Sequence, residues 1–84
     1  MGSYNISLKE SAKKEIGSLE KKEIKRILDR IKDLATNPRP VNSKKLAEDQ
    51  YRVRQGDYRI IYEVFDDIKK IAIVKVRHRK EVYR

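Results

Sequence analysis

The feature that most constrains the fold is an alternation of apolar and basic residues in the C-terminal half of the chain. Between residues 51 and 79, three segments with this alternation are separated by turn sequences at 55–57 and 66–69. Successive side chains of a strand point to opposite faces of its sheet, so the pattern predicts one apolar and one cationic face. The apolar face is expected to carry Tyr51, Val53, Tyr58, Ile60, Tyr62, Val64, Ala72, Val74 and Val76. The cationic face is expected to carry Arg52, Arg54, Arg59, Lys75, Arg77 and Arg79.

The N-terminal residues predict a short strand followed by a helix. Apolar and polar residues alternate over positions 4–8, which is typical of a strand with one buried face. Ser7 and Glu10 have the spacing of a capping box, so a first helix of about two to three turns is expected to begin there. Gly17 and Ser18 supply its end.

A second helix is predicted over residues 19–36, where apolar residues recur at helical spacing until Asn37-Pro38 ends the pattern. The two helices are expected to form an antiparallel hairpin with one apolar side. Residues 36–49 contain both prolines and read as an ordered loop that Leu46 anchors as its single apolar contact.

The order strand, helix, helix, three strands predicts an α+β fold of the type β-α-α-β-β-β. We expect a mostly antiparallel, four-stranded sheet with the N-terminal helical hairpin packed on one face. A chain of 84 residues is too short for two independent cores, so residues 4–84 are predicted to form a single domain. We interpret residues 1–3, Met-Gly-Ser, as a cloning remnant.

The charge of the chain indicates a polyanionic partner. Twenty-two Lys and Arg against 13 Asp and Glu give a net charge of +9. The chain has no cysteine, which excludes a disulfide framework, a thiol nucleophile and a thiolate zinc site. No apolar run approaches the roughly 20 residues of a membrane helix, so a cytoplasmic protein with no membrane contact is expected.

Three segments of the C-terminal half resemble a known family. They are Tyr51-Arg52-Val53-Arg54, Gly56-Asp57-Tyr58-Arg59-Ile60-Ile61-Tyr62-Glu63-Val64, and His78-Arg79-Lys80-Glu81-Val82-Tyr83-Arg84. With the predicted helix order and Leu46, they resemble the RelE branch of the RelE/ParE toxin superfamily over nearly the whole chain. The resemblance implies a type II toxin that cleaves mRNA in the ribosomal A site, inhibits translation, and is silenced by a cognate antitoxin.

The resemblance also implies catalytic roles for three residues. Arg59 matches the arginine that stabilises charge on the scissile phosphate, Arg79 matches the one near the leaving group, and Tyr83 matches the aromatic that stacks on an mRNA base. Arg52 and Arg54 stand where some members have Lys to contact the phosphate backbone and assist activation of the 2′-hydroxyl. Because arginine stays protonated, these two are expected to bind and orient RNA without accepting a proton.

Further basic residues complete the predicted RNA-binding set, namely Lys75, Arg77 and Lys80. Arg77 is a departure, since the family frequently has Gly at that position. The single histidine, His78, is interpreted either as a packed side chain or as a catalytic one. Glu63 is interpreted either as a base or as an ion-pair partner of Arg52 or Lys75.

The predicted chemistry requires neither metal nor cofactor. RNA supplies its own nucleophile in the 2′-hydroxyl, and preset guanidinium groups stabilise the charge that develops on the phosphate. The expected partners are mRNA, the ribosome with its 16S rRNA, and an acidic antitoxin. Two alternatives stay open, a ParE-like toxin that poisons DNA gyrase and a non-catalytic nucleic-acid-binding module.

Overall fold

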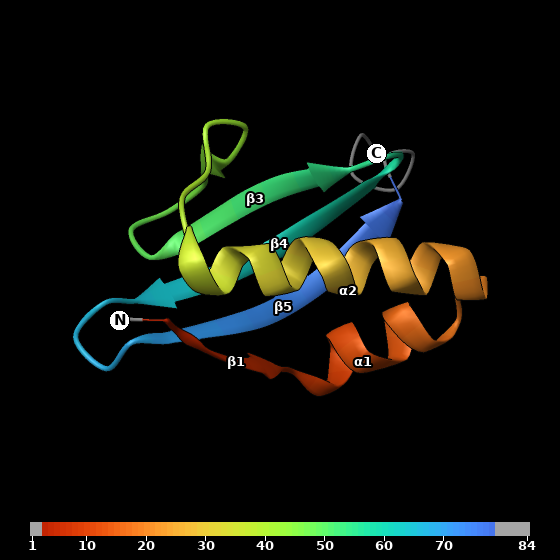
Figure 1. The fold of residues 1–84 in the computed structure, drawn as a ribbon, viewed down its shortest axis with the longest axis horizontal. Helices are drawn as coiled ribbons and strands as arrows, with labels where there is room; N and C mark the ends of the chain where they lie inside the picture. The colour runs from red at the N-terminus through yellow and green to blue at the C-terminus, as the bar shows by residue number, and fades with distance from the viewer. Residues whose placement is uncertain (1–2, 79–84) are drawn as a thin grey trace.

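The chain folds into one sheet with the longer helix across one face and the shorter helix beside one edge (Figure 1). A computed structural model describes residues 3–78. Within that range the elements in chain order are β1 (Asn5–Leu8), α1 (Glu10–Gly17), α2 (Lys21–Thr36), β2 (Lys44–Lys45), β3 (Gln50–Gln55), β4 (Tyr58–Phe65) and β5 (Lys70–His78). The predicted α+β class and the helical hairpin are therefore confirmed.

The sheet has five strands over residues 3–78, in the order β1-β5-β4-β3-β2. Strands β2 to β5 are antiparallel to their neighbours, whereas β1 runs parallel to β5 at the other edge. The prediction of four strands omitted the two-residue strand β2, which lies in the loop expected at 36–49. Parallel neighbours need a long crossover, and here the intervening helices and strands provide it.

The core lies between α2 and the sheet. Ile27, Ile31 and Leu34 recur at helical spacing on α2 and are buried against the strands. Ala12 and Ile16 of α1 close the same core from the side. The sheet contributes Tyr51, Val53, Ile60, Tyr62, Val64, Ile71, Ile73 and Val76. The apolar pattern of the sequence therefore positions α2 on one face and leaves the basic side chains for the other.

Because β5 contains a β-bulge, the prediction of which face its side chains occupy is partly wrong. The register with β4 shifts by one residue, so that Val74 is extra on β5. Before the bulge, Ile71 and Ile73 face the helices in place of the predicted Ala72 and Val74, and Ala72 is buried on the opposite face. After it, Val76 is buried as predicted. Because of the bulge, Lys75 and Arg77 lie on the cationic face predicted for them.

The predicted capping box is wrong. Ser7 belongs to β1, where it pairs with β5, and α1 starts at Glu10 with Lys9 as an N-cap that makes no side-chain bond. Pairing with a neighbouring strand satisfies the backbone of Ser7, so the local cap is not formed. The predicted end of α1 at Gly17 is confirmed.

Leu46 is not the buried anchor of the loop, because the residue is 41% exposed. Backbone bonds hold this segment instead, including the one from the amide of Leu46 to the carbonyl oxygen of Gln50 at 2.8 Å. Neither helix within residues 3–78 is long and apolar enough to cross a membrane.

Candidate nucleic-acid interface

Three arginines lie side by side across the central strands, and we call them the arginine row. In the register of the sheet, Arg54 of β3 is opposite Arg59 of β4, and Arg59 is opposite Arg77 of β5. Directly opposite side chains have Cβ atoms about 4.5–5.5 Å apart, and like charges at that spacing destabilise a sheet. The register therefore sets three like-charged residues next to one another on one face of the sheet.

The three members of the row differ in their surroundings. Arg59 is 6% exposed and sits on a central strand, so its backbone position is fixed from both sides. Arg54 is exposed, and its Nε donates to the carbonyl oxygen of Gly56 at 3.1 Å. The Nε of Arg77 lies 3.1 Å from a carboxylate oxygen of Glu15 on α1. The three residues of the arginine row therefore differ in burial, and Arg54 and Arg77 have different bonding partners.

A second line of positive charge runs beside the arginine row. Arg52, Ile61 and Lys75 face each other across β3, β4 and β5, and Lys44 of β2 is opposite Arg52. All of these basic residues lie on the face that the core does not use. The predicted RNA-binding residues Arg52, Arg54, Lys75 and Arg77 are thus brought together with Arg59.

Glu63 does not form either of the ion pairs considered for it. Its carboxylate lies 3.7 Å from Nζ of Lys9. It is four residues along β4 from Arg59, which corresponds to about 13 Å of strand. One phosphate cannot contact both groups at that separation, so the geometry does not favour Glu63 as the base.

His78 is on the helix side of the sheet, opposite the face of Arg59, and it borders the same pocket as Arg77. Its ring packs edge-on against Tyr58 with the centroids 5.3 Å apart at 90°. The two rings border a pocket of about 500 Å³ beneath the turn between the helices. This placement favours the packing interpretation of His78 over the catalytic one.

Three predicted site residues, Arg79, Lys80 and Tyr83, lie outside the described residues. Arg79 follows directly on His78, the last residue of β5. Their roles therefore stay predictions from the resemblance.

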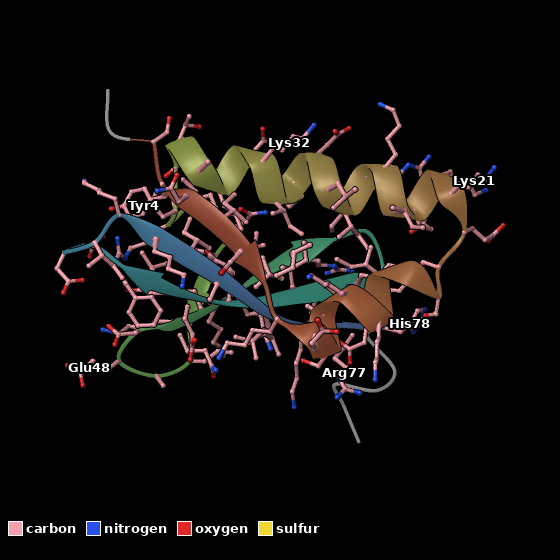
Figure 2. All side chains as sticks on the ribbon, turned by 90° about the horizontal axis from the view of Figure 1, so that it is seen from below. Tyr4, Lys21, Lys32, Glu48, Arg77 and His78 are labelled. Atoms are coloured by element: carbon pink, nitrogen blue, oxygen red, sulfur yellow. The ribbon has the colours of Figure 1, made fainter. Side chains whose placement is uncertain are left out.

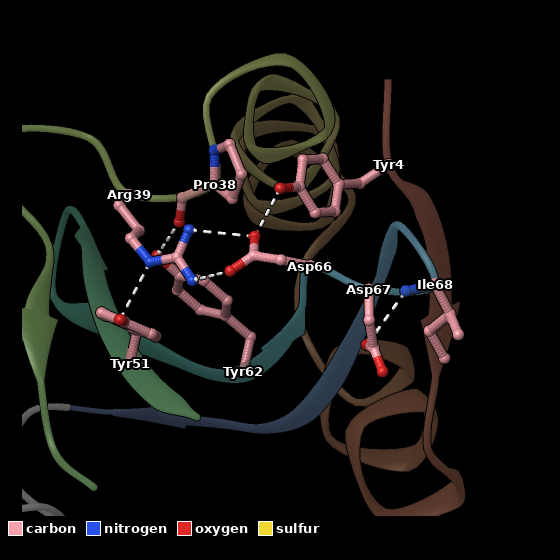
Figure 3. A network of polar contacts seen from close by, with 8 residues as sticks. All are labelled: Tyr4, Pro38, Arg39, Tyr51, Tyr62, Asp66, Asp67 and Ile68. Atoms are coloured by element: carbon pink, nitrogen blue, oxygen red, sulfur yellow. Dashed lines mark hydrogen bonds and ion pairs between the residues drawn. The ribbon is translucent and has the colours of Figure 1, made fainter. Parts of the chain in front are cut away.

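The structure also contains a polar network that the sequence did not indicate (Figure 3). The guanidinium of Arg39 donates to both carboxylate oxygens of Asp66, at 3.2 and 2.8 Å, and its Nε donates to the hydroxyl of Tyr51 at 2.9 Å. The hydroxyl of Tyr4 donates to the same carboxylate. These bonds, from Arg39 first and Tyr4 second, lower the pKa of Asp66 to about 2.

One buried hydroxyl extends the network into the core. Tyr62 donates to the carbonyl oxygen of Pro38 at 2.7 Å, and burial raises the pKa of Tyr62 to about 12. The network joins the start of the loop after α2 to the turn between β4 and β5. Arg39 and Asp66 are 27 positions apart, so no periodic pattern could have revealed them.

No group of His, Asp or Glu within residues 3–78 is arranged to hold a metal ion. The cationic face is the chemically distinctive surface of the described chain. It carries exposed basic side chains around the buried Arg59.

Comparison with known proteins identifies the family of this chain. Residues 6–83 match the family described as ParE toxin of type II toxin-antitoxin system, parDE. A protein of Methanocaldococcus jannaschii assigned as toxin RelE1 is 29% identical over 86 residues, covering 96% of each chain.

Solved structures show the same fold. RelE in the archaeal RelE-RelB complex from Pyrococcus horikoshii OT3 has a TM-score of 0.80 and 31% identity, covering 92% of this chain and 96% of that one. The isolated E. coli RelE toxin has a TM-score of 0.80 at 24% identity, covering 96% and 92%. The chain therefore belongs to the ParE toxin family of type II toxin-antitoxin systems, and its relatives place it in the RelE branch of the RelE/ParE superfamily.

Proposed function

We propose that this toxin is a ribosome-dependent endoribonuclease that cleaves mRNA in the A site and thereby inhibits translation. The observation that carries the proposal is the arginine row, in which Arg59 stands between Arg54 and Arg77. Arginine presents several donors in a planar fork that matches a phosphate. A nuclease that uses the 2′-hydroxyl as nucleophile needs such donors more than it needs a metal ion.

The proposed reaction is an in-line attack of the 2′-hydroxyl oxygen on the adjacent phosphorus. The bond from phosphorus to the 5′-oxygen breaks, which leaves a 2′,3′-cyclic phosphate and a 5′-hydroxyl end. Arg59 would stabilise the charge on the non-bridging oxygens, and Arg79 would act near the leaving oxygen. Tyr83 would stack on a base and thereby align the nucleophile.

The remaining basic residues would bind the RNA backbone. Lys44, Arg52 and Lys75 continue the positive charge from the arginine row across the sheet. Contacts of this kind fix the position of the RNA and make its binding depend on salt. Lys80 is assigned the same role from the sequence alone.

We further propose that an acidic antitoxin silences the toxin in the cytoplasm. The net charge of +9 would attract such a partner, and the Pyrococcus horikoshii relative was solved as a RelE-RelB complex. A partner that covers the cationic face would exclude RNA. Expression of this chain alone in a bacterium is therefore expected to arrest growth, and co-expression of the antitoxin is expected to restore it.

A second candidate function is inhibition of DNA gyrase, which is suggested by the ParE description of the matched family. Two parallel assays with the purified chain discriminate between the functions. Programmed ribosomes with end-labelled mRNA report a cut in the A site, and gyrase with plasmid DNA reports supercoiling. We expect A-site cleavage with unchanged supercoiling; loss of supercoiling with intact mRNA would support the second function instead.

A further inference from the structure

Helix α1 closes an edge of β5 that β1 leaves open. The pairing of β1 with β5 reaches only as far as Ile73. Beyond that point two side chains of α1 replace the missing strand. The hydroxyl of Ser11 donates to the carbonyl oxygen of Val74 at 2.8 Å, and a carboxylate oxygen of Glu15 accepts the amide of Val76 at 2.8 Å.

Glu15 makes a second contact with its other carboxylate oxygen. That oxygen lies 3.1 Å from Nε of Arg77, and the Glu15 side chain is 23% exposed. One carboxylate therefore holds both the backbone of Val76 and the guanidinium of the next residue. Figure 2 shows Arg77 and His78 beside α1 at one end of the molecule.

The two contacts of Glu15 lie at the part of β5 that β1 does not reach. Beyond the bulge at Val74, β5 pairs with β4 on one side only, so Glu15 supplies the contact on its other side. The negative charge of Glu15 also offsets part of the repulsion within the arginine row. The ion pair between Glu10 and Lys13 of α1, at 3.9 Å, lies on the outer surface of the helix instead.

We propose that Glu15 is a positioning residue, which sets the end of β5 and so places Arg77 in the arginine row for the proposed cleavage. The inference rests on the function proposed above, but its structural part can be measured without RNA. A glutamine at position 15 keeps an acceptor for the Val76 amide and loses the charge. An alanine loses both.

The structural arm uses amide exchange by NMR on the full chain carrying Glu15→Ala, Glu15→Gln or the matched controls Glu10→Ala and Glu10→Gln. We expect the amide of Val76 to exchange about ten- to a hundredfold faster in Glu15→Ala, as for loss of a hydrogen bond to a charged acceptor. Glu15→Gln should retain most of the protection. The amide of Val53, on a strand that Glu15 does not contact, should be unchanged.

The functional arm measures single-turnover cleavage on programmed ribosomes. Glu15→Ala should slow cleavage about tenfold, Glu15→Gln should restore most of the rate, and both Glu10 variants should stay within about twofold of wild type. If Glu15→Ala does not fold, Glu15→Gln tests the proposal by itself. In that variant the Nε–H of Arg77 should exchange faster than in wild type, while the amide of Val76 stays protected.

Several results would overturn the proposal. They are unchanged protection of Val76 in Glu15→Ala, loss of protection throughout the sheet in Glu15→Gln, and equal effects of the Glu10 and Glu15 variants on cleavage. Absence of cleavage by the wild-type chain would overturn the proposed function, whereas the exchange of Val76 would still test the structural claim.

Discussion

Tyr62→Phe removes one hydroxyl from the core and changes little else. Tyr62 is 0% exposed, and its hydroxyl donates to the carbonyl oxygen of Pro38 at 2.7 Å. Loss of the hydrogen bond costs about 0.5–1.5 kcal/mol, and the half-buried carbonyl left without its donor adds up to about 1 kcal/mol. We expect a loss of about 1–2 kcal/mol, which lowers the Tm of a domain of this size by about 5–15 °C.

The matched control is Tyr4→Phe, which removes a hydroxyl from the exposed side of the same network. That hydroxyl donates to the exposed carboxylate of Asp66, so water can replace it, and the expected loss is below about 0.5 kcal/mol. Thermal and urea unfolding followed by circular dichroism measure both variants. The reasoning would be refuted if both variants lost the same unfolding free energy, or if Tyr62→Phe had the Tm of wild type. Either result would show that burial of the Tyr62 hydroxyl does not set its contribution to stability.

The pH dependence of the stability of Tyr62→Phe gives an independent check of the burial of the Tyr62 hydroxyl. Burial raises the pKa of Tyr62 from 10 to about 12, so the folded state favours the neutral hydroxyl. The neutral hydroxyl of Tyr62 stabilises the folded state fully below about pH 10, and this stabilisation is lost as the pH rises through about 12. The difference in unfolding free energy between wild type and Tyr62→Phe should therefore narrow over that interval. A constant difference would contradict the reasoning.

Three further expectations concern stability. Asp66→Asn should lower the Tm near pH 7. The difference in Tm from wild type should vanish as the pH falls from about 4 to about 2, because the bonds from Arg39 and Tyr4 keep the carboxylate of Asp66 ionised down to that range. Leu46→Ser should change the unfolding free energy by less than about 0.5 kcal/mol, and a larger loss would show that Leu46 anchors the loop after all. Ile27→Ala should cost about 2–5 kcal/mol in urea unfolding because Ile27 is fully buried; a loss below about 1 kcal/mol would place it outside the core.

The fold was predictable wherever a residue's position depends on periodicity. The helical spacing of Ile27, Ile31 and Leu34 gave the buried face of α2, and alternation gave the faces of β3 and β4. The bulge at Val74 was not predictable, because one extra residue shifts the phase without changing the composition of the strand. The two-residue strand β2 was missed because it is too short to show any alternation.

The candidate site was predictable in part for the same reason. Alternation placed Arg54, Arg59 and Arg77 on one face, but their alignment in one row depends on register, which the turns and the bulge determine. The contact of Arg77 with Glu15 joins residues 62 positions apart. Interactions between such distant residues have no local signal in a single sequence.

The most direct test of the account is the single-turnover rate of mRNA cleavage by Arg59→Ala on preassembled, programmed ribosomes. The control is Arg26→Ala, which removes the same charge from an exposed position of α2. Loss of one preset donor to the transition state should lower the rate about 10²- to 10³-fold in Arg59→Ala, while Arg26→Ala stays within about twofold of wild type. Equal rates for the two variants, whether both unchanged or both reduced, would contradict a catalytic role for the arginine row.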